Sequence, residues 1–172
     1  MPDRPLEGLL AATQFLTRVP VRLRRAPDLA AAVVWFPVVG GLIGALAGGI
    51  AAVLGRGTTP AVGAAVGVLV GVLVTGAFHE DGLADLADAV AGGTTPERRL
   101  EILKDPRHGT YGVAALCGSI VLRVVIVGSL PATVALAGLI SAHALARGAA
   151  VVTMAVGPLA RPDGLGAGYA AA

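Results

Sequence analysis

Charged and aromatic side chains are scarce in this sequence. Only 14% of its 172 residues are charged and 3% are aromatic, whereas 55% are hydrophobic and the mean hydropathy is +0.80. Soluble domains usually carry about 25% charged residues, so this composition favours an integral membrane protein. The net charge of +2 is too small to indicate a nucleic-acid partner. Cysteine occurs once, as Cys117, which excludes a disulfide framework within the chain.

Long apolar runs are abundant instead. A helix of about 20 apolar residues, rising 1.5 Å per residue, is long enough to cross a bilayer. Four stretches meet this condition and are predicted to span the membrane: residues 29–54, 60–78, 111–130 and 132–157. The predicted fold class is therefore all-α, a polytopic membrane helical bundle with about four transmembrane helices plus short cytoplasmic and interfacial helices.

The remaining segments complete a single integral membrane domain over residues 1–172. Residues 1–28 are expected to form an interfacial N-terminal segment, because leucines recur at roughly helical spacing within residues 5–17. Basic residues cluster at the N-terminus and in the 79–110 loop, and Arg161 follows the last span. Under the positive-inside rule, this distribution predicts that the N-terminus and the 79–110 loop are cytoplasmic.

Small residues repeat every four positions in three of the predicted spans. The stripes are Gly40, Gly44 and Gly48; Gly63, Gly67 and Gly71; and Gly138, Ala142, Ala146 and Ala150. Such stripes let helix backbones approach closely in lipid. Because they occur on several spans, they favour packing within one bundle over homodimerisation, although a homo-oligomer stays an open alternative.

Acidic residues gather directly after the second apolar run, in the stretch "HEDGLADLADAVAGG" at 79–93. Asp81, Asp85 and Asp88 are spaced i, i+4, i+7, which places them on one face of a helix, with Glu80 beside them. Like charges at this spacing repel one another, and a divalent cation would relieve the repulsion. Mg²⁺ is the predicted ion, because it takes hard oxygen ligands and shares them with substrate phosphates. The alternative is a solvated acidic face at the end of the span.

A second short helix is predicted after the acids, in "GGTTPERRLEILKDPRHGTYG". Gly92 and Gly93 are expected to end the acidic helix, and Thr94 or Thr95 to cap a new one that runs to about Lys104. Lys104 and Arg107 are predicted to bind phosphate. For Arg98 and Arg99, contact with anionic lipid headgroups fits the sequence as well as a role in the site does.

Ionisable side chains also lie inside the predicted spans. Arg123 and Arg147 are reasonable contacts for an anion, since intramembrane charges tend to face the bundle interior or a polar cavity. His79 and His108 flank the acidic segment, where a hydrogen-bonding role is the better interpretation and a proton relay is the alternative. His143 is better interpreted as a satisfied core histidine than as a ligand. From the residues alone, the leading hypothesis is phosphoryl or nucleotidyl chemistry on an amphiphilic substrate at a cytoplasm-facing Mg²⁺ and phosphate site.

The segment "FHEDGLADLADAVAGGTTPERRLEILKDPRHGTYG" closely resembles the signature region of the adenosylcobinamide-GDP ribazoletransferase (cobalamin synthase) family. Further similarity lies in "FLTRVPV" at 15–21, "WFPVVGGLIGA" at 35–45 and "LARPDGLG" at 159–166. The resemblance implies an enzyme of the last steps of cobalamin biosynthesis in the bacterial cytoplasmic (inner) membrane. Adenosylcobinamide-GDP and α-ribazole, or its 5′-phosphate, would give adenosylcobalamin, or its 5′-phosphate, and GMP, with Mg²⁺ required.

The resemblance also implies roles for particular residues. Asp81, Asp85 and Asp88 would be catalytic and, together with Glu80, would hold Mg²⁺ on the substrate diphosphate. Phosphate contacts would come from four basic residues: Lys104, Arg107, Arg147 and Arg161. Family members continue well past the "ARPDGLG" region, so we expect this chain to be a truncated form. Two other functions stay open: a CDP-alcohol phosphatidyltransferase-like membrane enzyme and a cation transporter subunit.

Overall fold

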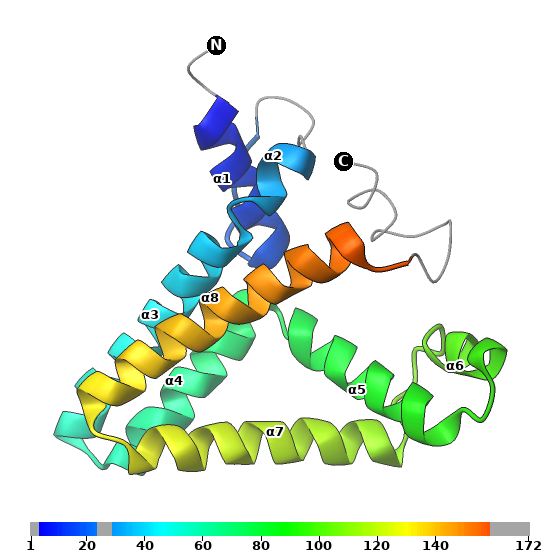
Figure 1. The fold of residues 1–172 in the computed structure, drawn as a ribbon. Helices are drawn as coiled ribbons and strands as arrows, with labels where there is room; N and C mark the ends of the chain where they lie inside the picture. Colours follow the sequence, from blue (N-terminus) through cyan, green and yellow to red (C-terminus); the bar gives the residue numbers. More distant parts are fainter. Residues whose placement is uncertain (1–3, 24–28, 159–172) are drawn as a thin grey trace.

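The computed structural model describes residues 4–23 and 29–158, and all regular secondary structure in them is helical (Figure 1). The helices are α1 (Arg4–Leu16), α2 (Leu29–Val33), α3 (Phe36–Gly57), α4 (Pro60–Thr75), α5 (Phe78–Gly92), α6 (Pro96–Ile102), α7 (Thr110–Ser129) and α8 (Ala132–Val156). Three of them, α3, α7 and α8, are long and apolar enough to cross a membrane. The bent pair α4–α5 brings the number to four if it counts as one span. The prediction of an all-α polytopic bundle is confirmed.

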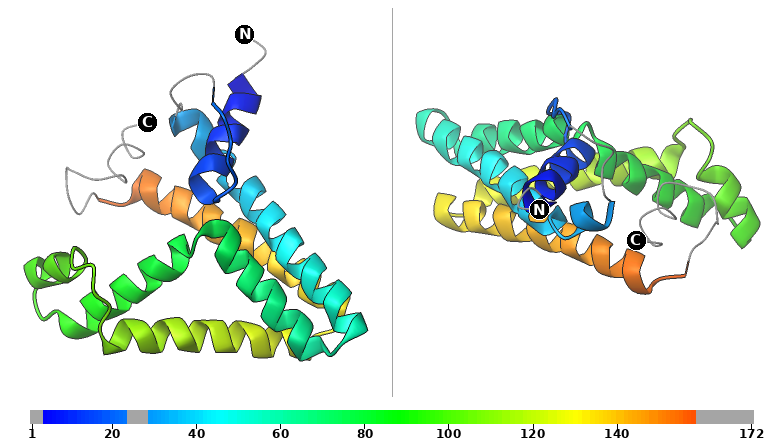
Figure 2. Two further views of the ribbon diagram at one scale, coloured as in Figure 1. Left: turned by 180° about the vertical axis from the view of Figure 1, so that it is seen from behind. Right: turned by 90° about the horizontal axis from the view of Figure 1, so that it is seen from above.

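The helices enclose a triangle (Figures 1 and 2). Helix α3 lies between α4 and α8 and packs against both over most of its length. Helices α4 and α5 form two sides of the triangle, and α7 forms the third by reaching from the end of α5 back to the start of α4. This arrangement places the acidic helix α5 against the first turns of α7.

Glycines make the close packing around α3 possible. A Cβ on Gly44 would lie on the carbonyl oxygen of Leu139 in α8, and one on Gly63 would lie on the carbonyl oxygen of Ala51 in α3. Two of the three predicted stripes therefore face neighbouring helices within the bundle. In the third stripe, a Cβ on Gly138 would meet nothing within 4 Å in the described part of the chain.

Two predicted spans differ from the observed helices. The first is broken at Val34 and Trp35, and Pro37 lies in the first turn of α3, where its missing N–H costs no helical hydrogen bond. The second ends at Thr75 because Gly76 and Ala77 both adopt left-handed backbone conformations, with φ of 66° and 59°. The chain bends by 89° there, so α5 leaves α4 at a right angle.

The N-terminal helix is attached to this bend. The apolar side of α1 buries Ala11, Ala12 and Leu16 in a cluster that includes Phe36 of α3. The backbone N–H of Arg18 donates to the carbonyl oxygen of Val74 at 2.7 Å, near the end of α4. Much of the apolar side of α1 thus packs on protein.

Candidate metal and active site

The acidic helix α5 presents two carboxylates to a histidine from the loop before α7. The Oδ1 atoms of Asp81 and Asp85 lie 3.6 Å and 3.5 Å from the two ring nitrogens of His108. Each residue offers one ligand atom, and these three atoms lie within 4.8 Å of one another. The group reaches solvent, with side chains that are 65% exposed for Asp81, 29% for Asp85 and 39% for His108. A ligand could therefore approach it directly.

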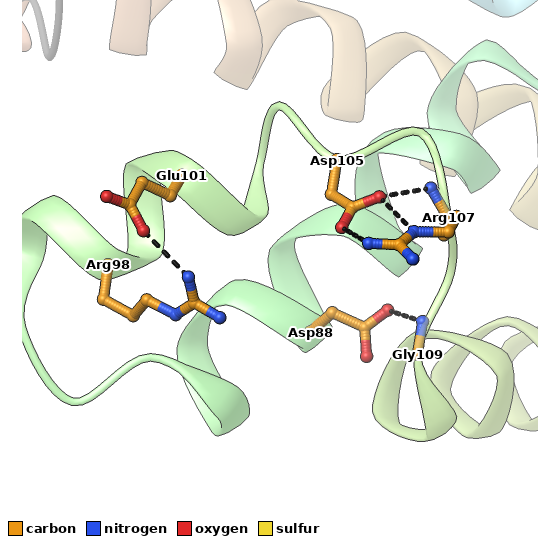
Figure 3. A network of polar contacts seen from close by, with 6 residues as sticks. All are labelled: Asp88, Arg98, Glu101, Asp105, Arg107 and Gly109. Carbon is orange, nitrogen blue, oxygen red and sulfur yellow. Dashed lines mark hydrogen bonds and ion pairs between the residues drawn. The ribbon is translucent and has the colours of Figure 1, made fainter.

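Asp88, one turn further along α5, lies against the backbone of α7. Its Oδ2 accepts a hydrogen bond from the N–H of Gly109 at 2.7 Å (Figure 3). Its Oδ1 accepts one from the N–H of Gly112 at 2.9 Å. The first N–H groups of a helix have no partner within the helix, and a carboxylate there also meets the positive end of the helix dipole. Asp88 thus caps α7 from outside and holds the adjacent His108 near the other two acids.

The two glycines of "RHGTYG" explain how Asp88 can come so close. A Cβ on Gly109 would lie 2.6 Å from Asp88 Oδ1, and a Cβ on Gly112 would overlap Asp88 Oδ2. Only glycine leaves space for the carboxylate at both positions.

Glu80 points away from the other acids, toward α7. Its Oε1 accepts a hydrogen bond from Arg123 at 2.9 Å, and its side chain is only 9% exposed. The structure therefore does not bring Glu80 or Asp88 into the group formed by Asp81, Asp85 and His108.

The predicted phosphate contacts that the structure describes do not converge on one place. Arg107 is 86% exposed and forms a double hydrogen bond with the carboxylate of Asp105, at 2.9 and 2.7 Å (Figure 3). This pairing lowers the pKa of Asp105 to about 2 and raises that of Arg107. Lys104 is exposed just after α6. Arg147 is buried in α8, and Arg161 lies outside the described residues.

The segment that follows the acidic helix α5 has the helix end and the helix cap that the sequence predicts. Helix α5 ends at Gly92, and the side chain of Thr95 caps α6 by accepting the N–H of Arg98 at 3.2 Å. The Arg98 side chain then pairs with Glu101 on the surface of α6 (Figure 3). These local contacts stabilise α6, which immediately precedes the loop that carries His108.

The residues present fit a divalent cation. Two ligands in neighbouring positions of an octahedral Mg²⁺ shell, each about 2.1 Å from the ion, lie about 3 Å apart. One ion takes only one of the two ring nitrogens of His108, and the distance from either nitrogen to its nearer carboxylate, 3.5 Å for Nδ1 to Asp85 or 3.6 Å for Nε2 to Asp81, is close to that value. Carboxylate oxygens suit Mg²⁺ and Mn²⁺ alike, whereas an imidazole nitrogen is the more typical ligand of transition metals. The donor set could therefore hold a divalent cation, and it does not distinguish these two.

Comparison with known proteins identifies the family of the chain. Residues 8–172 match the family model described as cobalamin-5-phosphate synthase. The chain belongs to that family. It is 42% identical over 168 residues to the adenosylcobinamide-GDP ribazoletransferase of Bradyrhizobium diazoefficiens, with 94% of this chain and 64% of the relative covered. It is 40% identical to that of Ralstonia nicotianae, with 91% and 64% covered.

The relative from Pseudomonas paraeruginosa, with the same name, is 42% identical over 165 residues. That alignment covers 94% of this chain and 67% of the relative. The chain thus spans about two thirds of the length of these family members, and the match includes the whole acidic segment. No solved structure gives a significant match.

Sequence reasoning about this family member missed two relationships. The sequence suggests hydrogen bonding or a proton relay for His108, and it does not indicate that the ring lies beside both Asp81 and Asp85. The pairing of Glu80 with Arg123 joins residues 43 positions apart, and no local pattern indicates it.

Proposed function

We propose that this chain joins adenosylcobinamide-GDP to α-ribazole, or to α-ribazole 5′-phosphate, and releases GMP. The observation that carries the proposal is the group of Asp81, Asp85 and His108 on the family's acidic segment. A bound divalent cation, for which we propose Mg²⁺, would neutralise the negative charge that develops on the transferred phosphoryl group and on the departing nucleotide.

The chain's own residues would act around that diphosphate. Asp81 and Asp85 hold the ion through their exposed oxygens. Lys104 and Arg107 bind phosphate oxygens, with Arg107 exchanging Asp105 for the substrate. Arg161 is proposed for the same role on the basis of the family resemblance only.

The bond changes are those of an in-line displacement. A ribose hydroxyl oxygen of the acceptor forms a new bond to the phosphorus that carries the corrinoid side. The bond from that phosphorus to the bridging oxygen breaks, and GMP leaves with the electron pair. The hydroxyl proton passes to a carboxylate of the Asp81–Asp85 pair or to His108, whichever group is free to accept it.

The helix arrangement supports a membrane location for this chemistry. We propose that the chain lies in the bacterial cytoplasmic membrane, with its N-terminus and the loop that contains α5 and α6 on the cytoplasmic side. The basic residues near these segments support that orientation. A nucleotide-bearing substrate would then reach Asp81 and Asp85 from the aqueous side.

The test is GMP release from adenosylcobinamide-GDP in the presence of α-ribazole by the full chain in lipid nanodiscs, with and without Mg²⁺. We expect Asp81→Ala and Asp85→Ala to lower the rate by at least a hundredfold and to lose binding of Mn²⁺, followed by its paramagnetic resonance spectrum. Glu97→Gln removes an exposed acid of α6 and serves as the matched control. Wild-type metal binding in both aspartate variants would overturn the site assignment. GMP release that is absent from the wild-type protein as well would overturn the activity.

A further inference from the structure

An ion pair links the first turn of α5 to the second half of α7. Arg123 Nη1 donates to Glu80 Oε1 at 2.9 Å, and the side chains of Glu80 and Arg123 are 9% and 31% exposed. Arg123 also donates from Nε to the carbonyl oxygen of Ser119 at 3.4 Å, which ties the guanidinium to its own helix. The pair therefore bridges two sides of the helix triangle (Figure 1).

Arg123 meets α5 away from the group that could hold an ion. A cavity of about 190 Å³ has both Glu80 and Arg123 in its lining, but not Asp81, Asp85 or His108. The Asp81 side chain is 65% exposed, whereas its neighbour Glu80 is buried against α7. Any influence of Arg123 on the metal site must therefore pass through Glu80 and the α5 backbone.

The direction of Glu80 determines the direction of the two aspartates. Successive side chains on an α-helix point about 100° apart, so Asp81 and Asp85 point about 100° and 140° from Glu80 and within about 40° of one another. On that side lies His108, whose ring nitrogens are 3.6 and 3.5 Å from the two Oδ1 atoms. A rotation of α5 that released Glu80 from α7 would turn both carboxylates relative to His108.

Glu80 and Asp88 hold α5 on α7 at two levels. Asp88 accepts the backbone N–H groups of Gly109 and Gly112, and it lies eight residues, or about 12 Å, beyond Glu80 along the helix. Asp81 and Asp85 lie between these two attachments in the chain. Helix α4 contributes little support, because the chain turns by 89° and few residues of α4 and α5 meet. Without Glu80, the first turn of α5 would lose its ionic attachment to α7.

We propose that Arg123 is a positioning residue for the metal site. By holding Glu80 it sets the rotation of α5 about its axis, and so directs Asp81 and Asp85 toward His108. Glu80 acts as the partner of Arg123 rather than as a metal ligand. This inference rests on the metal site of the proposed function, and it does not depend on which group is transferred.

The charge of Arg123 on its own would have the opposite effect. A guanidinium near a divalent-cation site repels the ion, so Arg123→Gln should strengthen Mn²⁺ binding if the arginine acted only through its charge. A positioning role predicts weaker binding, because Glu80 is released from α7 and can turn to Arg147, which also lines the cavity. The sign of the change therefore separates the two roles.

The experiment is titration of the full chain in lipid nanodiscs with Mn²⁺, followed by paramagnetic resonance, with the thermal midpoint measured on metal-free samples. We expect Arg123→Gln and Glu80→Gln each to weaken Mn²⁺ binding by about tenfold, the lower end of the effect of groups that orient metal ligands. Arg123→Lys should bind within about threefold of the wild-type protein, since the ammonium is still a charged donor.

A double variant tests whether the two residues act through one contact. Arg123→Gln combined with Glu80→Gln should bind Mn²⁺ no more weakly than either single variant, because the contact is lost only once. It leaves neither member of the ion pair as an unpaired charge, so it can be measured even where Arg123→Gln does not fold, and it should still bind more weakly than the wild-type protein. Arg56→Gln, at the exposed end of α3, should leave Mn²⁺ binding unchanged.

The outcomes separate this proposal from the metal site itself. Unchanged or stronger Mn²⁺ binding in Arg123→Gln would overturn the positioning role and leave the site in place. A loss in Glu80→Gln alone would show that Glu80 is a ligand. A lower thermal midpoint with wild-type Mn²⁺ affinity would show that the ion pair serves stability only. Absence of Mn²⁺ binding by the wild-type chain would overturn the positioning role together with the site.

Discussion

The carboxylate of Asp88 accepts the backbone N–H of Gly109 at 2.7 Å, and this contact joins the acidic helix to the start of α7. The same carboxylate accepts the N–H of Gly112 at 2.9 Å. Because His108 directly precedes Gly109, the pair also determines where the histidine ring lies. An acid of α5 thus serves to position another residue of the candidate site.

Replacing Asp88 with asparagine should destabilise the protein and loosen the metal site together. Asparagine has one acceptor oxygen, so one of the two backbone N–H groups loses its partner and the charge at the helix N-terminus is gone. We expect a loss of about 1–3 kcal/mol in the free energy of unfolding, measured by denaturant titration in detergent. Mn²⁺ affinity should fall as well, because His108 is no longer held.

The control for this substitution is Glu97→Gln in α6, which removes an exposed acid without touching α7. It should leave both stability and Mn²⁺ affinity at wild-type values. An Asp88→Asn protein of unchanged stability would contradict the capping role.

Adding a single methyl group at Gly112 should have a similar effect. A Cβ there would overlap Asp88 Oδ2 and lie 2.8 Å from the carbonyl oxygen of Ala84, so α5 and α7 must separate. Overpacking of this kind costs about 1–3 kcal/mol, and the thermal midpoint of Gly112→Ala should fall accordingly.

Gly118→Ala provides the matched comparison in the same helix. A Cβ at Gly118 would meet nothing within 4 Å, and alanine favours a helix over glycine by about 1 kcal/mol in soluble hosts. Its midpoint should be equal to or above that of the wild-type protein. Equal losses in the two variants would show that glycine itself, rather than the space beside Asp88, is required in α7.

Features that depend on short sequence spacing could be predicted well. The apolar runs predicted spans at 111–130 and 132–157, and α7 and α8 cover Thr110–Ser129 and Ala132–Val156. Gly92 ends α5 and Thr95 caps α6, because turn and cap chemistry is contained within a few residues.

Features that depend on distant contacts could not be predicted. Gly76 is a local signal for the end of α4, but Ala77 also takes a left-handed conformation that alanine rarely adopts, so the local sequence does not indicate the bend that turns α5 away from α4. Helical spacing placed Asp81, Asp85 and Asp88 on one face, but it does not show which neighbour each meets. Asp81 and Asp85 meet His108, whereas Asp88 meets the backbone at the start of α7 immediately after it.

Close packing between α3 and α8 gives a further prediction. Gly44→Ala would place a Cβ on the backbone carbonyl of Leu139, which cannot move without shifting α8. The expected loss is about 1–3 kcal/mol in the free energy of unfolding in detergent. Gly49→Ala, where a Cβ would meet nothing within 4 Å, should be neutral. Identical behaviour of the two variants would contradict packing through this face.

Replacing His108 should affect the binding of Mn²⁺ and of Mg²⁺ differently. If its ring nitrogen is a ligand, His108→Ala should weaken Mn²⁺ binding by about tenfold or more, since an imidazole contributes more to a transition metal than to Mg²⁺. Mg²⁺ affinity, measured by competition against Mn²⁺ in paramagnetic resonance, should change by less than about threefold, because Asp81 and Asp85 supply its oxygen ligands. An equal fall for both ions would show that His108 only positions the carboxylates. No change for either ion would remove it from the site.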